Sequence, residues 1–169
     1  MSDGHRPVTL RPIEDADWEQ VWPIFAATVA AGETYAYPED LTSDEARALW
    51  VEDVPGQTVV LVEDGVVLGT AKMGPNRPGR GDHVGTASFM VAEAARGRGV
   101  GRQLAEYVVG WHRDQGYRAI QFNAVVETNT AAVRLWESLG FRIVGTVPGA
   151  FRSERHGYVG LHVMVLDLG

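Results

Sequence analysis

The stretch "ARGRGVGRQL", residues 95–104, places three glycines and three arginines in ten residues and then continues as a helix. Behind it, Leu104, Ala105 and Val108 recur at helical spacing. Glycines let a backbone approach a ligand closely, and a helix that starts directly after them adds free N–H groups and the positive end of its dipole. The stretch therefore favours a pyrophosphate cradle over its alternative, a solvated turn with incidental arginines.

Two common phosphate-binding motifs do not match this stretch. A P-loop requires Gly-x4-Gly-Lys-Ser/Thr, and the stretch contains no Lys, Ser or Thr. A Rossmann fingerprint requires Gly-x-Gly-x-x-Gly directly after a strand, but counting from Gly97 places Arg102 where the last glycine should be. Gly97 also lies several residues beyond the apolar run 88–91. The spacing therefore excludes both motifs.

Composition limits the class of protein. The chain has 169 residues, is 45% hydrophobic and carries a formal net charge of −7. Its apolar content suffices for a core, and its acidic balance argues against a general nucleic-acid binder, which needs a basic surface. The absence of cysteine excludes disulfides, a thiolate nucleophile and Cys-ligated zinc. No signal-peptide core or membrane-length apolar run is present, so we expect a cytoplasmic protein without a nucleic-acid or membrane partner.

Apolar periodicity and turn residues predict an α/β chain with the order β-α-α-β-β-β-α-β-α-β-β. Asp64-Gly65 predicts a type I′ turn in the hairpin 57–73. Thr42 or Ser43 with Glu45 predicts a capping box. The other predicted elements are a strand from residue 8, helices starting near 13–15 and spanning 42–54, 101–117 and 128–140, and strands 83–92, 118–126, 141–147 and 158–168. We expect one domain over residues 1–169, with its core at about 8–168.

Two segments carry a family resemblance. "SFMVAEAARGRGVGRQLAEYVV" resembles the acetyl-CoA-binding motif of the GNAT N-acetyltransferases, with Arg96, Gly99 and Gly101 in the three defining places. "ETNTAAVRLWESLGF" resembles the family's Asn-x-x-Ala…Leu-Tyr…Gly-Phe segment. The run 122–151 is similar to the branch that includes the yeast acetyltransferases of azetidine-2-carboxylate and related proline analogues. The resemblance implies a GNAT fold, in which about four helices flank a mixed sheet splayed between its fourth and fifth strands.

The same resemblance implies acetyl-CoA as cosubstrate and assigns residues to it. The glycine loop would hold the pyrophosphate on its N–H groups, and the strand before it would pair with the pantetheine amides. The residues expected to bind acetyl-CoA are Phe89, Met90, Val91, Arg96, Gly97, Arg98, Gly99, Val100, Gly101, Arg102, Asn129, Ala132 and Trp136.

The catalytic groups depart from the family pattern. The tyrosine that protonates the leaving thiolate in many members is replaced by Trp136, whose indole is no acid, so this side chain packs either the cofactor or the core. The common glutamate base is missing, since residues 83–91 offer only Thr86 and Ser88. By resemblance, Asn123 holds the acceptor or an activating water, and Asn129 contacts acetyl-CoA or the acceptor. The alternatives are a strand-end residue for Asn123 and a helix cap for Asn129.

The loop 30–40 is expected to form a wall of the acceptor pocket. Glu33 could attract an ammonium group, or it could be an exposed loop acid, while Tyr35 and Tyr37 could shape an apolar slot. Thr86 stands where the related branch often has a further asparagine, which leaves the acceptor open. The histidines lack the spacing of metal ligands, so no metal is expected.

The sequence therefore predicts an acetyl-CoA-dependent N-acetyltransferase that acts by direct transfer on a small primary or secondary amine, an amino acid or analogue. We also expect a homodimer. Two alternatives stay open. A protein N-terminal or lysine acetyltransferase needs an open groove, whereas the loops 30–40 and 75–83 look able to enclose a small molecule. A non-catalytic acyl-CoA-binding module is conceivable because the usual tyrosine is missing.

Overall fold

A computed structural model describes residues 7–169, and in that range the strands and α-helices follow the predicted order. The strands are β1 (Val8–Pro12), β2 (Gln57–Glu63), β3 (Val66–Pro75), β4 (Val84–Val91), β5 (Ala119–Val126), β6 (Arg142–Ser153) and β7 (Gly157–Asp167). The α-helices are α1 (Trp18–Ala31), α2 (Ser43–Trp50), α3 (Val100–Asp114) and α4 (Thr130–Ser138). Short 3-10 turns precede α1 and α3 and lie between β3 and β4.

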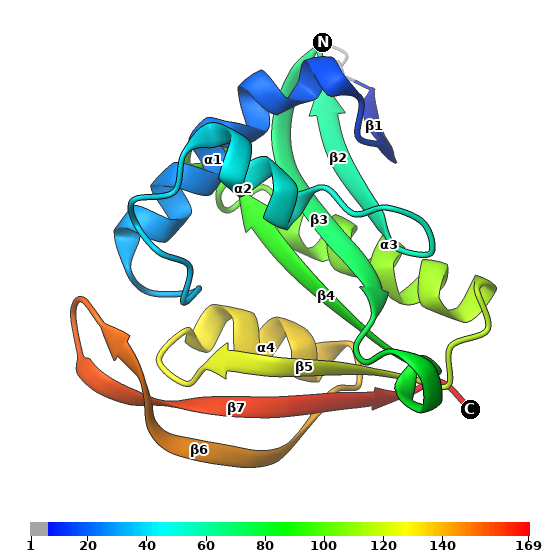
Figure 1. Cartoon of the computed structure of the whole chain (residues 1–169), viewed down its shortest axis with the longest axis vertical. Coiled ribbons are helices and arrows are strands. Elements are labelled where there is room, and N and C mark those ends of the chain that lie inside the picture. The colour runs from blue at the N-terminus through cyan, green and yellow to red at the C-terminus, as the bar shows by residue number, and fades with distance from the viewer. Residues whose placement is uncertain (1–6) are drawn as a thin grey trace, which may run out of the picture.

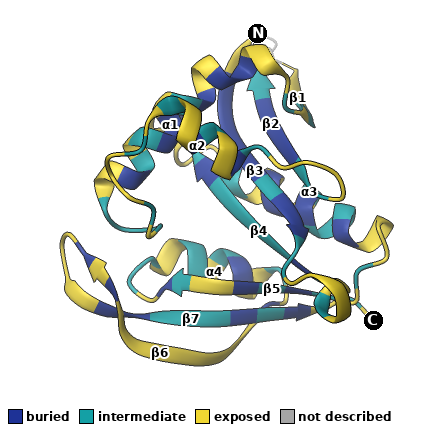
Figure 2. Cartoon of the chain, in the orientation of Figure 1, coloured by how far each residue is buried: buried dark blue, intermediate teal, exposed yellow. Residues whose placement is uncertain are grey.

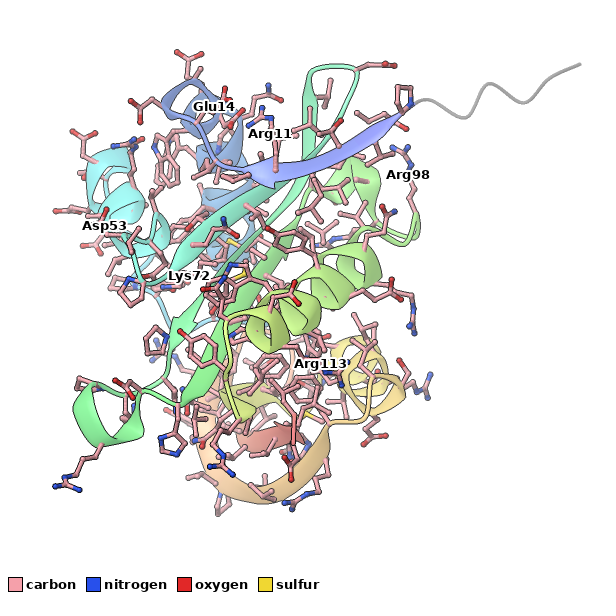
Figure 3. The ribbon with its side chains drawn as sticks, turned by 90° about the vertical axis from the view of Figure 1, so that its right-hand side faces the viewer. Arg11, Glu14, Asp53, Lys72, Arg98 and Arg113 are labelled. Carbon is pink, nitrogen blue, oxygen red and sulfur yellow. The ribbon has the colours of Figure 1, made fainter. Side chains whose placement is uncertain are left out.

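The strands form one mixed sheet in the order β1-β2-β3-β4-β5-β7-β6. Every neighbouring pair is antiparallel except β4 and β5, which are parallel. Helices α1 and α2 cover one face of the sheet, and α3 and α4 lie on the other (Figures 1 and 3). The β4-α3-β5 crossover is thus the β-α-β unit that the sequence predicts.

The sheet opens between β4 and β5. These strands pair only at Val84 with Ala119 and at Gly85 with Ile120, and they diverge beyond this point (Figure 1). The remaining peptide groups on that edge of β4 therefore have no partner in β5. The predicted splay between the fourth and fifth strands is confirmed, and it determines where a ligand can enter.

Buried side chains form clusters on both faces of the sheet, and the central strands β2 and β3 are buried along most of their length (Figure 2). One cluster, with Phe25 and Trp50, lies under α1 and α2. A second, with Leu104 and Val108, lies under α3, and a third joins α4 to β5 and β7 around Phe122. The third cluster also includes Ala105 of α3 and packs against Ala87 and Phe89 of β4, so side chains join the two halves of the sheet where their strands part.

Two local sequence signals form as predicted. Asp64 and Gly65 both have positive φ, 51° and 77°, as the type I′ turn requires. Thr42 caps α2, because its side chain accepts a hydrogen bond from the Glu45 N–H while the Glu45 carboxylate accepts one from the Thr42 N–H. Short-range chemistry therefore determines these element boundaries.

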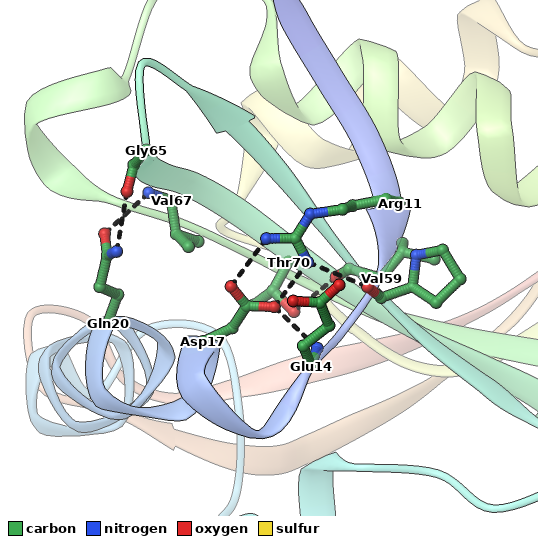
Figure 4. A network of polar contacts seen from close by, with 9 residues as sticks. Arg11, Glu14, Asp17, Gln20, Val59, Gly65, Val67 and Thr70 are labelled. Atoms are coloured by element: carbon green, nitrogen blue, oxygen red, sulfur yellow. Dashed lines mark hydrogen bonds and ion pairs between the residues drawn. The ribbon is translucent and has the colours of Figure 1, made fainter.

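The start of α1 is displaced from its predicted position by a polar network (Figure 4). Arg11 donates two hydrogen bonds to the Asp17 carboxylate, at 2.7 and 2.9 Å, and the Glu14 N–H donates a third at 2.7 Å. These contacts hold residues 15–17 in a 3-10 turn, so the α-helix begins at Trp18. Gln20 then bridges the Gly65 carbonyl and the Val67 N–H, which fixes α1 against the β2–β3 hairpin.

Two other elements differ in length from the prediction. Helix α2 ends at Trp50 rather than near residue 54, because the Thr58 hydroxyl donates to the Trp50 carbonyl and accepts from the Glu52 N–H. Strand β6 continues to Ser153 although Gly145, Pro148 and Gly149 suggest a break. Two register shifts against β7 accommodate these residues.

No helix in residues 7–169 combines the length and apolar character needed to cross a membrane.

Candidate active site

A cleft of about 870 Å³ lies where β4 and β5 separate. Its walls come from β4, β5, α4, the loop after α1 and the turn between β6 and β7. The residues of the expected site that line it are Glu33, Tyr35, Thr86, Phe89, Met90, Val91, Arg96, Gly101, Asn123, Asn129, Ala132 and Trp136. One cleft therefore brings together side chains that the sequence assigned to cofactor, acceptor and catalysis.

The glycine loop leads to the mouth of this cleft in a shape suited to an anion. Gly97 and Gly99 have φ of 77° and 75°, and a Cβ at either would meet no atom within 4 Å. Helix α3 makes its first hydrogen bond from the Gln103 N–H to the Gly99 carbonyl, so the N–H groups of Val100, Gly101 and Arg102 have no acceptor within the helix. Open space, free N–H groups and a helix N-terminus meet the needs of a pyrophosphate.

The three arginines of the loop have different surroundings. Arg96 lines the cleft. Arg98 forms an ion pair with Glu63 at 2.8 Å and lies on the outer side of the loop (Figure 3). Arg102 donates to the Ser138 hydroxyl at 2.8 Å, which joins α3 to α4. Arg96 is thus the loop arginine that faces the interior of the cleft.

Val100 contributes its backbone rather than its side chain. The side chain is buried against β3, where a Cβ on Gly69 would lie 2.7 Å from Val100 Cγ1. The close approach of α3 to the sheet therefore requires a glycine at position 69. This contact fixes the first turn of the helix and with it the direction of the free N–H groups.

On β4, a tyrosine occupies the peptide edge that faces the opening. The Tyr35 hydroxyl donates to the Phe89 carbonyl at 2.6 Å and accepts from the Phe89 N–H at 2.8 Å. A ligand can pair with this peptide only if the hydroxyl releases it. Tyr37 does not line the cleft, because its ring packs against Phe25 with 5.1 Å between the centroids.

Trp136 belongs both to the core and to the cleft wall. It is 7% exposed, and its ring centroid lies 4.8 Å from those of Phe89 and Phe122. It also borders the cleft. The side chain thus anchors α4 to the strands on both sides of the opening, which accounts for a large aromatic group at this position.

Asn123 lies in a bulge of β5. Phe122 pairs with Met164 and Val125 with His162, so Asn123 and Ala124 together oppose one residue of β7. Asn123 donates to the Asn76 Oδ1 at 2.6 Å and accepts from the Gln121 Nε2 at 2.9 Å. Its partner outside β5 is therefore Asn76, which directly follows β3 and which the sequence could not single out because its signal was only that of a loop.

Asn129 caps α4, as one of its predicted alternatives stated. Its side-chain oxygen accepts from the Ala132 N–H at 3.3 Å. The residue also lines the cleft. The carboxamide nitrogen is left for a ligand, because the cap uses only the oxygen.

Glu33 has a structural task that the sequence did not indicate. Its carboxylate accepts from the Ser153 hydroxyl at 2.7 Å and from the Arg155 N–H at 2.9 Å. The hydrogen bond from Ser153, with the Arg155 N–H in support, lowers the pKa of the Glu33 carboxyl. The loop after α1 is thereby tied to the β6–β7 turn, whose Arg155 and His156 also line the cleft and were missed by the sequence.

Comparison with known proteins agrees with this geometry. The profile of the Acetyltransferase (GNAT) family matches residues 17–141. The chain is 30% identical over 146 residues to an L-methionine sulfoximine/L-methionine sulfone acetyltransferase of Salmonella typhimurium, covering 83% of this chain and 84% of that one. It is 36% identical over 98 residues to the N-acetyltransferase aca1 of Schizosaccharomyces pombe, covering 57% of this chain. The match spans only 47% of aca1.

Solved structures give the same result. A GCN5-related N-acetyltransferase from Kribbella flavida superposes with a TM-score of 0.93 and 58% identity, covering 95% of this chain and 98% of that one. The acetyltransferase yncA from Salmonella typhimurium, solved with its cofactor acetyl-CoA, superposes with a TM-score of 0.80 and 26% identity, covering 96% and 94%. Sequence profile, relatives and fold agree, and the chain belongs to the GNAT family of acetyltransferases.

Proposed function

We propose that this protein transfers the acetyl group of acetyl-CoA directly to the amine of a small molecule, an amino acid or an analogue. The observation that carries the proposal is one cleft at the β4–β5 opening, which is lined by Arg96 and Gly101 of the glycine motif together with Asn123 and the β6–β7 turn. The relative from Salmonella typhimurium, named for two small amino-acid derivatives, supports the acceptor class.

The residues present fit acetyl-CoA. The free N–H groups of Val100, Gly101 and Arg102 and the guanidinium of Arg96 would hold the pyrophosphate. The β4 edge at Phe89–Val91 and the wall at Ala132 and Trp136 would hold the pantetheine arm. The bound cosubstrate would supply an acetyl thioester that an amine can attack.

Asn123 would orient the acceptor or a water beside it. Its carboxamide oxygen accepts hydrogen bonds from Gln121 and Asn76, and one of its two N–H bonds points to Asn76. The second N–H is left for the ligand. An amide takes no proton near neutral pH, so the proton of the amine would leave through water or a backbone carbonyl, and we expect the rate to rise with pH as the acceptor deprotonates.

A screen of acceptors tests the proposal. CoA release from acetyl-CoA would be followed with free amino acids, proline analogues and L-methionine sulfone, beside peptides with a free N-terminal amine or a lysine. Turnover with small amines and none with peptides is the expected result. Preference for peptides would indicate a protein acetyltransferase, and acetyl-CoA binding without any turnover would indicate a binding module.

Asn123→Ala tests the acceptor end of the cleft. We expect kcat/KM for the acceptor to fall by about two to three orders of magnitude, as for loss of a transition-state hydrogen-bond donor. The dissociation constant of acetyl-CoA should stay at the wild-type value. Asn76→Ala should lower kcat/KM by a smaller factor, because it removes a hydrogen-bond partner of Asn123 but leaves the Asn123 carboxamide in the cleft. Wild-type kinetics for Asn123→Ala would limit this residue to a structural role in the β5 bulge, where it bonds to Asn76.

We further propose that residues 1–169 form one acetyltransferase domain, with its core at about 8–168, and that two copies associate through β6. This edge strand is exposed over most of its length (Figure 2). Ile143, Val144 and Val147 are 39, 48 and 54% exposed. An apolar edge strand with unpaired peptide groups invites a second chain. The cytoplasmic location stays a prediction from the sequence.

A further inference from the structure

The Tyr35 hydroxyl has an unusual position for a residue of a surface loop. One oxygen atom bonds to both backbone polar groups of Phe89, its N–H and its carbonyl, on the edge of β4 from which β5 diverges. The side chain also lines the cleft. A ligand atom that accepts a hydrogen bond from the Phe89 N–H must therefore displace the Tyr35 oxygen from this N–H. The displaced hydroxyl then lies next to the ligand atom.

The loop that carries Tyr35 is held in place from the opposite side of the opening. The Glu154 N–H donates to the Gly32 carbonyl at 3.1 Å, and Glu33 accepts from the buried Ser153 hydroxyl and from the Arg155 N–H. The β6–β7 turn thus anchors the chain immediately before Tyr35. The tyrosine is a fixed part of the cleft wall rather than a side chain on a free loop.

Few groups in the cleft can hand a proton to a thiolate that leaves beside the β4 edge. Glu33 is ionised, because the hydrogen bond from Ser153 lowers its pKa, and Arg96 and Arg155 do not deprotonate. The Trp136 indole is too weakly acidic, and no serine or threonine hydroxyl that lines the cleft in residues 7–169 contacts the Phe89 N–H and carbonyl as the Tyr35 hydroxyl does. Tyr35 is the one phenol that lines the cleft within residues 7–169, and His156, which also lines it, lies near Glu33 on the β6–β7 turn.

We propose that the Tyr35 hydroxyl donates the proton to the departing thiolate, a role that rests on the acetyltransferase function proposed above. As the amine nitrogen bonds to the acyl carbon, the carbon–sulfur bond breaks and its electron pair goes to sulfur, which takes the phenolic proton. The proton lost by the amine nitrogen returns to the Tyr35 oxygen through water. The sum is amine plus thioester to amide plus thiol, with the tyrosine unchanged.

The surroundings of Tyr35 keep its proton in place until it is needed. Burial raises the pKa of the phenol above its usual value, so the hydroxyl stays protonated over the range in which amines become nucleophilic. The contact with Phe89 also explains how the proton is directed. In the free protein the Tyr35 hydroxyl donates its proton to the Phe89 carbonyl. When a ligand pairs with the β4 edge, an atom of the ligand replaces this carbonyl as the acceptor of the Tyr35 proton.

Tyr35→Phe tests the proposal against Tyr107→Phe, a matched control on α3 that removes a hydroxyl bound to Gln57 at 2.9 Å, outside the cleft. We expect Tyr35→Phe to lower kcat by at least about 100-fold, as for loss of a general acid. Its acetyl-CoA affinity, measured by calorimetry, should stay within a few-fold of wild type. Unchanged turnover, or a tighter acetyl-CoA complex with full turnover, would make Tyr35 a placeholder on the β4 edge and overturn the proposal.

A second measurement needs no acceptor. The thiol of bound CoA is titrated by the ultraviolet absorbance of its thiolate in wild type and in both variants. A tyrosine that donates to sulfur stabilises the thiolate, so Tyr35→Phe should shift the titration upward by about one pH unit or more, and Tyr107→Phe should not. The absence of a shift, or a similar shift in His156→Gln alone, refutes the assignment. If wild type turns over no amine, the proposed function fails while this titration still decides the role of Tyr35.

Discussion

At the scale of single residues, two neighbouring glycines of the same motif have different constraints. Gly99 requires a positive φ of 75°, so any side chain there strains the backbone. Gly101 lies within α3, and a Cβ would make only ordinary contacts, 3.8 Å from Leu135 and 4.0 Å from Val91. Gly101 is therefore the better position at which to test the pyrophosphate site, because a substitution there separates binding from folding.

Gly101→Glu should abolish acetyl-CoA binding, with a rise of at least about 100-fold in the dissociation constant, because it places a carboxylate among N–H groups that await an anion. Thermal unfolding of the free protein should change little. Gly110→Glu is the matched control, since it lies in the same helix and its Cβ would meet nothing within 4 Å. Calorimetry that finds wild-type affinity for Gly101→Glu would disprove the phosphate assignment.

At the scale of elements, α3 is joined to the sheet by a buried histidine where β4 and β5 begin to part. His112 is fully buried, and its Nδ1 lies 2.8 Å from the Val108 carbonyl, so this nitrogen carries the proton. The ring occupies the space that a Cβ on Gly85 would need. Nε2 has no hydrogen-bond partner in the described part of the chain, and a second proton there would be costly.

The stability of the fold should therefore depend on His112 in mildly acidic solution. Burial lowers the pKa of His112 below its usual 6.5, so below about that pH the unfolded chain binds a proton that the native state does not. The free energy of unfolding should decrease as the pH falls below about 6.5, by at most about 1.4 kcal/mol per pH unit. Above it, this residue should contribute no slope.

Denaturant titrations at a series of pH values measure this slope. His112→Gln should flatten it between about pH 6.5 and the acid range in which carboxylates titrate, whatever its effect on absolute stability. His83→Gln, at an exposed position between β3 and β4, should leave the slope as it is. Equal slopes in wild type and His112→Gln would show that another group is responsible.

At the scale of the whole molecule, the two edge strands of the sheet differ in length. Strand β1 is short, whereas β6 extends over twelve residues at the opposite edge. Natural sheets shorten, charge or cover their edges to avoid unwanted pairing. A long edge with Val144 and Val147 exposed is therefore consistent with the proposed dimer.

Val147→Lys should shift a dimer toward monomer by placing a charge on this apolar edge. Val66→Lys offers a close control, because Val66 has the same exposed fraction of 54% and lies in β3 at the hairpin turn. Sedimentation over a range of concentrations should show dissociation for the first variant and none for the second. Wild-type protein that sediments as a monomer throughout would remove the basis of the proposed interface.

Much of the fold could be predicted because its signals are local. The hairpin turn at Asp64-Gly65, the capping box at Thr42 and the glycine loop before α3 depend on residues within one or two turns of chain. Such interactions form from neighbouring residues whatever the rest of the molecule does. The splay of the sheet, in contrast, came from the resemblance to a family, because no local pattern states where two strands part.

The contacts of the candidate site depended on tertiary structure. The Tyr35 hydroxyl meets a peptide 54 residues away, Asn123 meets a side chain 47 residues away, and Glu33 meets Ser153 across 120 residues. The sequence identified Tyr35, Asn123 and Glu33 as site residues, but their partners depend on how the loops close over the open sheet. The role of a side chain depends on the groups that it contacts. When these groups are far apart in the chain, only the packing of the whole molecule brings them together, so no single segment of sequence predicts the contact.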